Sequence, residues 1–160
     1  MKLPKGFVFR KATIGDIETI VEFWQKCRID EGTGKARKRE VCTFISNRTP
    51  GIYSGRVRQW FVKKDGVVVA TGAVDKFERT ITDLYVEEEC RGRGLGTAIL
   101  EKLEEQAVRL GVDSLYLQVT LETEPYYLNR GWQRREYCPI EKTKAGDVAT
   151  LDKKLTPQNK

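Results

Sequence analysis

The sequence predicts one α/β domain: a mixed, mainly antiparallel sheet of about seven strands with a central parallel pair, flanked by about four helices. The chain of 160 residues, 39% of them apolar, is long enough for one domain with one packed core. Apolar residues alternate with period two in some segments and recur at helical spacing in others. Between residues 80 and 119 a strand, a glycine loop, a helix and a strand follow one another, and this crossover makes the two strands parallel.

The N-terminal third contains one strand and two helices. Residues 7–11 alternate like a strand, and Thr13 with Asp16 resembles a capping box that opens a helix over 14–27. Residues 30–35 are polar and rich in glycine, which indicates a loop. A shorter helix is expected over 36–47, closed by Pro50 and Gly51.

The middle of the chain changes to period two. Residues 57–63 and 67–74 are β-rich runs around Lys64-Asp65-Gly66, which is typical of a tight hairpin. A third strand is expected over 80–87. After the glycine loop, a helix extends to about Leu110, where Gly111 ends it.

The last part of the chain predicts three more strands and a short helix. The strand at 114–119 is rich in apolar residues, and Pro125 opens a short helix that Gly131 ends. Residues 132–140 and 147–155 are expected to be strands. We expect a single domain over 1–160, with residues 1–5 and 156–160 frayed.

The absence of histidine excludes several reaction classes. Hydrolysis through an imidazole base, zinc held by histidine and phosphotransfer through histidine all require a residue that the chain lacks. Proton transfer must therefore use carboxylates, tyrosine, lysine, cysteine or water.

The four cysteines indicate no metal site. Cys27, Cys42, Cys90 and Cys138 form no C-x-x-C pair, and we expect reduced thiols in a cytoplasmic protein. The first residues lack the apolar stretch of a secretory signal, and no run approaches the length that crosses a membrane. Cys90, beside Arg91, is the one candidate for a reactive thiol.

The segment 91–97 is the most informative motif. Three glycines within five residues allow close approach of the main chain, and the helix that follows offers free N–H groups and the positive end of its dipole. Arg91 and Arg93 add positive charge, so the loop suits a phosphate or diphosphate. The spacing matches neither G-x-x-x-x-G-K-S/T nor the dinucleotide motif G-x-G-x-x-G. A simple glycine-rich connection with solvated arginines is the alternative.

Two motifs resemble those of the GNAT superfamily of acyl-CoA-dependent N-acetyltransferases. Arg91-x-x-Gly94-x-Gly96 resembles the superfamily's Q/R-x-x-G-x-G/A, and Tyr127-x-x-x-Gly131-Trp132 resembles its Y-x-x-x-G-F/W. They occur in the expected order, about 30 residues apart. The resemblance covers nearly the whole chain, although residues 30–55 match in topology and not in motif.

The resemblance implies that acetyl-CoA is the co-substrate and that no metal is needed. Its pantetheine arm is expected to lie along the strand at 84–86, between two splayed parallel strands, and its diphosphate on the loop amides. The implied cofactor-binding residues are Leu84, Tyr85, Val86, Arg91, Gly92, Arg93, Gly94, Leu95, Gly96 and Thr97.

The resemblance also implies roles for Tyr127 and Asp83. Tyr127 matches the tyrosine that protonates the departing thiolate, although packing on the sheet would also explain this residue; its neighbour Tyr126 is expected to be structural. Asp83 is the candidate base, with residues 87–89 and water as alternatives. Many relatives carry asparagine where this chain has Thr120. A hydroxyl replaces only one of the hydrogen bonds of an amide, so the contacts that the asparagine makes in those relatives are not assigned to Thr120.

Direct attack of an amine on the thioester, within a ternary complex, is the implied mechanism. The acceptor is a small-molecule or peptide amine, and Asp30 and Glu31 are the carboxylates that could attract it. A homodimer is compatible with the superfamily.

Two other functions compete with the enzyme. A non-catalytic acyl-CoA sensor would use the same loop. A basic nucleic-acid-binding module would use the net charge of +6 and the cluster at 35–39, but no nucleic-acid-binding motif accompanies them. We therefore expect neither nucleic acid nor a membrane as a partner.

Overall fold

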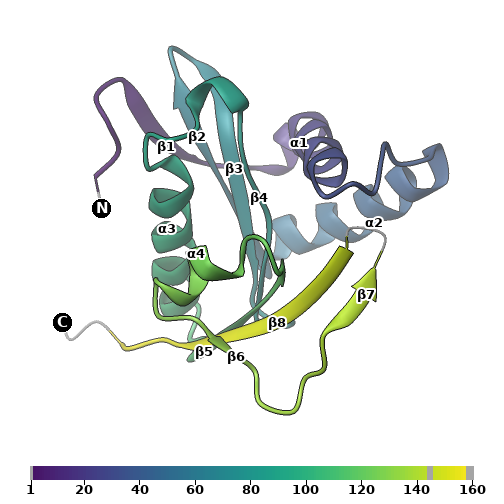
Figure 1. The fold of residues 1–160 in the computed structure, drawn as a ribbon. Helices are drawn as coiled ribbons and strands as arrows, with labels where there is room; N and C mark the ends of the chain where they lie inside the picture. Colours follow the sequence, from purple (N-terminus) through teal and green to yellow (C-terminus); the bar gives the residue numbers. More distant parts are fainter. Residues whose placement is uncertain (1, 144–145, 158–160) are drawn as a thin grey trace.

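A computed structural model describes residues 2–143 and 146–157, and it confirms the predicted fold class. In this part of the chain eight strands form one sheet in the order β1-β2-β3-β4-β5-β8-β6, with β7 paired to β8. The pairing is antiparallel except between β4 and β5, which are the predicted parallel pair. Helices α1 and α2 lie on one side of the sheet and α3 on the other (Figure 1).

The N-terminal segment closely follows the predicted order. It consists of β1 (Phe7–Lys11), a 3-10 turn η1 (Ile14–Asp16), α1 (Ile17–Asp30) and α2 (Lys38–Ser54). Ala12, Ile20 and Phe61 form a small buried cluster between these helices and the sheet. This cluster holds α1 and α2 against one face of the sheet.

The prediction that Pro50 and Gly51 end the second helix is wrong. Helix α2 continues through both residues and ends at Gly55, whose φ of 77° is the left-handed conformation typical of a helix C-terminus. Packing outweighs the hydrogen bond that proline removes. Gly51 is buried against Val57, where a Cβ would lie 2.8 Å from the Val57 Cγ2, and Ile52 packs on the Phe61 cluster.

The central meander confirms the predicted hairpin. Strands β2 (Val57–Lys64) and β3 (Val67–Asp75) are joined at Asp65 and Gly66, whose φ angles of 50° and 82° are those of a type I′ turn. Strand β4 (Thr80–Val86) pairs antiparallel with β3 and is followed by a 3-10 turn, η2 (Glu88–Cys90).

Helix α3 (Leu95–Arg109) covers the other face of the sheet and packs on the main core. Ile99, Leu100, Leu103 and Ala107 recur at helical spacing in the sequence and form one buried stripe. Gly111, with φ 77°, follows the helix end as expected. Strand β5 (Ser114–Thr120) then runs parallel to β4. The crossover therefore places the glycine loop at the end of β4, beside the divergence of β4 and β5.

The predicted strand over 132–140 is mostly wrong. After α4 (Glu124–Leu128), only β6 (Gln133–Arg134) and β7 (Glu141–Thr143) pair with β8 (Gly146–Lys154). The chain turns between them, because Cys138 N–H donates to the Arg135 carbonyl, Tyr137 has φ 64°, and Pro139 has no N–H for a ladder. Trp132 is buried in the main core instead of starting a strand.

The ends of the chain have no regular structure where they are described. Residues 2–6 and 155–157 lie outside helices and strands, although Leu3 and Leu155 pack against the main core. The predicted fraying of residues 1 and 158–160 falls outside the described residues.

The ion pair at the start of α1 predicts a pH-dependent contribution to stability. Hydrogen bonds from Arg10 (2.9 and 2.6 Å) lower the pKa of Asp16 to about 2. The pKa of an unperturbed aspartate is near 3.8, and at pH values above it the lowered pKa of Asp16 stabilises the folded protein. This stabilisation disappears as the pH falls toward 2. After allowance for solvent screening, we expect Asp16→Asn to lower the free energy of unfolding at pH 7 by about 1 kcal/mol.

Urea unfolding at pH 7 and pH 2.5 measures this effect. The difference between Asp16→Asn and the wild type should shrink at pH 2.5. Glu18→Gln, an exposed change on the same helix, is the control and should shift the free energy by less than about 0.5 kcal/mol at pH 7. An Asp16→Asn difference that is the same at both pH values would contradict the assignment.

Candidate active site

The parallel strands β4 and β5 separate soon after they meet. Thr80 and Tyr116 are their one paired position in the described chain, and Tyr116 N–H donates to the Arg79 carbonyl at 2.8 Å. Opposite β3, the register of β4 shifts where Asp83 adopts φ 57°, so β4 contains one extra residue. This bulge turns the end of β4 away from β5 and opens a V between them.

The glycine loop forms a cradle of main-chain N–H groups beside the V. Gly92 and Gly94 have φ angles of 73° and 78°, a conformation that favours glycine. The first hydrogen bond of α3 runs from Ala98 N–H to the Gly94 carbonyl, at 3.0 Å. The N–H groups of Leu95, Gly96 and Thr97 therefore have no acceptor within their helix, and the helix dipole adds positive potential there.

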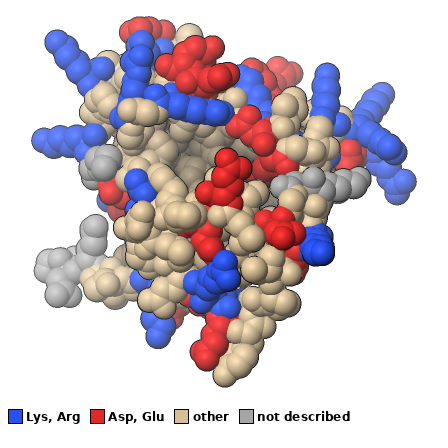
Figure 2. Space-filling view, viewed as in Figure 1, with Lys and Arg blue, Asp and Glu red and all other residues tan. Residues whose placement is uncertain are grey.

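A cavity of about 570 Å³ lies against this cradle and is called the loop cavity below. Nine of the ten predicted cofactor-binding residues line it: Leu84, Tyr85, Val86, Arg91, Gly92, Gly94, Leu95, Gly96 and Thr97. Arg93 is exposed and does not line it. In the space-filling view of Figure 2, this face is hollowed and carries both basic and acidic side chains.

Arg91 crosses from the loop to the end of α1. Its Nε donates to the Val86 carbonyl at 2.9 Å, its Nη2 donates to Asp30 Oδ2 at 2.8 Å, and its guanidinium lies over the Tyr85 ring. The positive charge therefore stays at the edge of the loop cavity.

The sequence interpretation missed, or assigned otherwise, five further residues that line the loop cavity: Asp30, Cys90, Thr123, Tyr126 and Arg130. Tyr126, expected to be structural, also lines it, and its hydroxyl lies 2.7 Å from Thr97 Oγ1. Arg130 lies over the Tyr126 ring and donates to the Tyr126 carbonyl at 2.6 Å. The spacing of Tyr126 and Arg130, four residues apart, is a signal that could have identified the pair. Cys90 is buried and lines the same cavity.

A second cavity of about 490 Å³ lies in the V and is called the cleft cavity below. It is lined by Asp83, Leu84, Glu31 and Tyr127, among others, and Leu84 also lines the loop cavity. The structure therefore brings both predicted catalytic residues together at one cavity, beside the one that the cofactor-binding residues line.

Tyr127 is held by aromatic contacts. Its ring packs edge-on against Trp132 and Tyr126, with ring centroids 6.3 and 5.0 Å apart. Burial, with a smaller contribution from Tyr126, raises the pKa of Tyr127 to about 12. Its hydroxyl is therefore protonated at neutral pH and can donate a hydrogen bond or a proton.

Asp83 is ion-paired with Arg48 of α2. The Arg48 Nη1 lies 2.7 Å from Asp83 Oδ2, and both side chains are close to nine-tenths buried, with exposed fractions of 12% and 11%. The same Nη1 donates to Gln59 Oε1 at 2.7 Å, and Gln59 Nε2 donates to Thr71 Oγ1 at 2.9 Å. The ion pair places the Asp83 carboxylate beside a polar network that runs from α2 to β3, although Asp83 Oδ2 itself accepts no hydrogen bond from the described residues.

The two carboxylates at the end of α1 separate. Asp30 lines the loop cavity and binds Arg91, whereas Glu31 lines the cleft cavity. Partial burial, with repulsion from Asp83 and Asp30, raises the pKa of Glu31. Glu31 and Asp83 thus place two carboxylates at the cleft cavity, which attract a cation there.

The remaining candidates are placed elsewhere. Glu87 is ion-paired with Lys26 of α1, and Glu88 and Glu89 are exposed in η2. The hydroxyl of Thr120 lies 3.1 Å from that of Thr123, so Thr120 supports the turn into α4.

The described residues contain neither a membrane-spanning helix nor a cluster that could hold a metal ion. No helix between residues 2 and 157, apart from the gap at 144–145, is long and apolar enough to cross a bilayer. Over the same ranges no three cysteine or acidic side chains are grouped to hold a metal ion.

Comparison with known proteins relates the whole arrangement to one family. The profile of the acetyltransferase (GNAT) family matches residues 18–132. An amino-acid acetyltransferase from Azotobacter vinelandii is 29% identical over 128 residues, which are 78% of this chain and 27% of that protein. This chain therefore spans about a quarter of the length of that relative.

Solved structures share the fold. A predicted acetyltransferase from Clostridium acetobutylicum with acetyl-CoA superposes with a TM-score of 0.73, at 21% identity over 84% of this chain and 95% of that one. A putative acetyltransferase from Salmonella typhimurium with acetyl-CoA gives a TM-score of 0.72, at 16% identity over 96% of each chain. The profile match covers well over half of the residues, so the chain belongs to the acetyltransferase (GNAT) family.

Proposed function

We propose that this protein is an N-acetyltransferase, which transfers the acetyl group of acetyl-CoA to an amine by direct attack within a ternary complex. The observation that carries the proposal is the V between β4 and β5. Leu84 lines both the cleft cavity in the V and the loop cavity beside it, so a cradle for a diphosphate adjoins a cavity that holds a tyrosine and two carboxylates. Family membership and the solved relatives that contain acetyl-CoA support the same activity.

The residues at the loop cavity fit acetyl-CoA. The N–H groups of residues 95–97 and the Arg91 guanidinium suit its diphosphate, and the polar groups of the diverging β4 edge suit the amides of the pantetheine arm. When bound there, acetyl-CoA supplies an acetyl group already activated as a thioester. The carbonyl and N–H groups of Val86 lie at the point where the arm would pass toward the V.

The side chains at the cleft cavity supply the proton transfers. Amide formation converts an ammonium and a thioester into an amide, a thiol and one released proton. Asp83 and Glu31 attract the ammonium and accept its proton, directly or through water, so that the neutral nitrogen can attack. Main-chain N–H groups at the strand opening stabilise the oxyanion. Tyr127 gives a proton to the sulfur as the C–S bond breaks, and it regains one from the nitrogen, which loses its second proton as the amide forms.

Calorimetry and a thiol-release assay test the proposed activity. We expect CoA to bind, and acetyl-CoA to release free thiol when an acceptor from a panel of amines is present. The absence of CoA binding at millimolar concentration would reject the enzyme and the acyl-CoA sensor together. CoA binding without any acetyl transfer would favour the sensor.

Removing the Tyr127 hydroxyl should impair turnover and leave cofactor affinity unchanged. Because general acid catalysis contributes about 10²- to 10⁴-fold, we expect Tyr127→Phe to lower kcat by about 100-fold. The Kd of CoA should change by less than about threefold, since Tyr127 does not line the loop cavity. Tyr126→Phe is the matched control and should raise that Kd instead. Equal losses of kcat and CoA affinity in Tyr127→Phe would make Tyr127 structural.

A further inference from the structure

A third cavity lies beside the candidate active site. It has a volume of about 700 Å³ between α2 and the sheet, and it is called the helix cavity below. Thr80 and Thr82 of β4 line both this cavity and the cleft cavity, so the two adjoin along one strand. The ion pair between Arg48 and Asp83 joins them, because Arg48 lines the helix cavity and Asp83 the cleft cavity.

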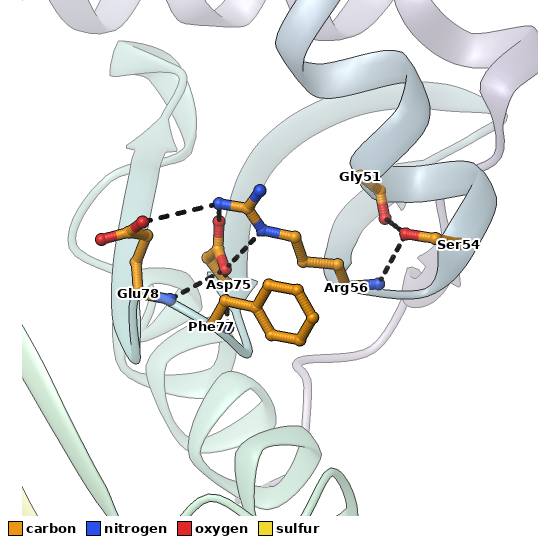
Figure 3. Close-up of polar contacts among 6 residues, drawn as sticks. All are labelled: Gly51, Ser54, Arg56, Asp75, Phe77 and Glu78. Carbon is orange, nitrogen blue, oxygen red and sulfur yellow. Dashed lines mark hydrogen bonds and ion pairs between the residues drawn. The ribbon is translucent and has the colours of Figure 1, made fainter.

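Most charged groups of the helix cavity are already engaged within the protein. Arg56 donates to both carboxylate oxygens of Asp75, at 3.1 and 2.9 Å, and lies 3.7 Å from Glu78. Its guanidinium also lies over the Phe77 ring, and Figure 3 shows it enclosed by these three side chains. Burial opposes the charge of Asp75, but the hydrogen bonds from Arg56 and two main-chain N–H groups outweigh it and lower the pKa of Asp75. This part of the wall is a closed salt-bridge cluster.

Arg48 differs because its guanidinium keeps unused donors. Its hydrogen bond to Gln59 and its closest approach to Asp83 both use Nη1. Nε and Nη2 donate no hydrogen bond to the described residues, although the side chain is only 12% exposed and lines the helix cavity. The position of the guanidinium is fixed by Asp83, Gln59 and the Phe44 ring, 4.8 Å away. A held guanidinium with free donors suits a carboxylate, which accepts two parallel hydrogen bonds.

The surroundings of Arg48 suit a carboxylate on an acceptor that also has an apolar part and a cation. The rings of Trp24 and Phe44 stack 4.2 Å apart and provide an apolar wall to the helix cavity. The other charged residues of its wall balance in sign, because Arg39 and Arg56 line it together with Glu40, Asp75 and Glu78. On the other side of Arg48, Asp83 and Glu31 line the cleft cavity and can bind the ammonium group of the acceptor. The two charges of a zwitterion therefore find opposite partners in adjoining cavities.

We infer that the acceptor is an amino acid, whose carboxylate binds Arg48 in the helix cavity while its amine meets Asp83 in the cleft cavity. The inference rests on the proposed acetyltransferase activity and specifies its substrate class. Arg48 is accordingly a specificity-determining residue, and Asp83 acts on the amine. In the free protein Arg48 and Asp83 neutralise each other, and a bound amino acid provides each with a second partner of opposite charge.

Matched acceptor pairs test the substrate class. The wild type is assayed by thiol release with each proteinogenic amino acid and with the amine that lacks its α-carboxylate. We expect kcat/KM to be about 10- to 100-fold higher for at least one amino acid than for its decarboxylated partner. Equal values for every pair, or a preference for phosphoethanolamine over all amino acids, would overturn the inference while leaving the acetyltransferase in place. CoA binding with no transfer to any acceptor would overturn both.

Variants of Arg48 test the assigned residue. Arg48→Met should reduce the preference for the amino acid to less than about threefold, mainly through KM, and Arg48→Lys should retain part of it. Calorimetric titration of the amino acid in the presence of CoA should show the same loss of affinity without turnover. Lys38→Met, which removes an exposed charge from the same helix, should behave like the wild type. Thermal unfolding shows whether Arg48→Met is folded. If it is not, the preference is measured in Arg48→Lys instead. A full preference in either folded variant would contradict the role of Arg48.

Discussion

Replacing Gly96 by glutamate is expected to abolish acetyl-CoA binding and to leave the protein folded. Gly96 lies in the first turn of α3 and lines the loop cavity. A Cβ there would make ordinary contacts, 3.7 Å from Val86 Cγ2 and 3.8 Å from the Tyr126 hydroxyl. An acidic side chain in the first turn is favourable for a helix, but it would place a negative charge where the diphosphate is proposed to bind. Since facing like charges cost several kcal/mol, we expect the Kd of CoA to rise by more than about 100-fold.

Two variants at the same position separate charge from size. Gly96→Gln has nearly the same shape as Gly96→Glu without the charge, and Gly96→Ala adds only the Cβ. We expect CoA affinity to fall in the order alanine, glutamine, glutamate, with thermal unfolding close to that of the wild type in all three. A Gly96→Glu protein that binds CoA as tightly as the wild type would disprove the proposed diphosphate site. Gly94 is a less informative position, because its φ of 78° would strain any other residue.

Replacing Gly72 by valine is expected to destabilise the protein more than any other change discussed here. Gly72 of β3 is buried under α3, at the register shift opposite the β4 bulge. A Cβ there would lie 2.8 Å from both Ile99 Cγ2 and Leu103 Cδ1, and 3.2 Å from Leu84 Cδ1. These atoms belong to the buried face of α3 and to the strand that forms the V. Overpacking a core costs about 1–3 kcal/mol and sometimes more. Valine adds a branched side chain at a site where the Cβ alone already meets three side chains, so Gly72→Val should be largely unfolded at 37 °C.

Gly72→Ala provides the measurable form of this prediction. We expect the free energy of urea unfolding to fall by about 1–3 kcal/mol, and CoA affinity to fall as well if Leu84 is displaced. Ala73→Val is an unsuitable control because Ala73 is also buried, so an exposed strand position such as Val8→Ala is used instead. A Gly72→Ala protein as stable as the wild type would show that α3 can move away from β3 at no cost.

The sequence predicts the parts of the fold that depend on local interactions. The Asp65-Gly66 turn, the buried stripe of α3 and its end before Gly111 follow from the conformational preferences of neighbouring residues. The crossover between β4 and β5 follows from the order of the elements and the handedness of such units. The loop motif likewise placed nine predicted residues around one cavity, because they are close together in the sequence.

The parts that could not be predicted depend on contacts between distant residues. Helix α2 passes through Pro50 because Gly51 and Ile52 pack against β2, and no local signal reveals this packing. Asp83 adopts a left-handed conformation within a strand pattern, where the register of β3 and β4 shifts. Its partner Arg48 comes from a helix whose charge pattern alone suggests solvation. Asp30 and Glu31 are neighbours in the sequence, which therefore suggests one acidic pair. In the structure α1 ends between them, and their side chains line different cavities.

The short helix α4 has a geometric consequence for how the chain tolerates insertions. Its neighbouring tyrosines contribute to separate cavities, Tyr126 to the loop cavity and Tyr127 to the cleft cavity. Successive side chains on a helix are rotated by about 100°, so one additional residue just before Tyr126 would turn both phenols away from their present neighbours. The directions in which the two phenols point are fixed by the start of α4 at Pro125 and by the left-handed conformation of Gly131 after its end. Length variation among homologous proteins should therefore be accommodated elsewhere, such as in the exposed connection between β6 and β7.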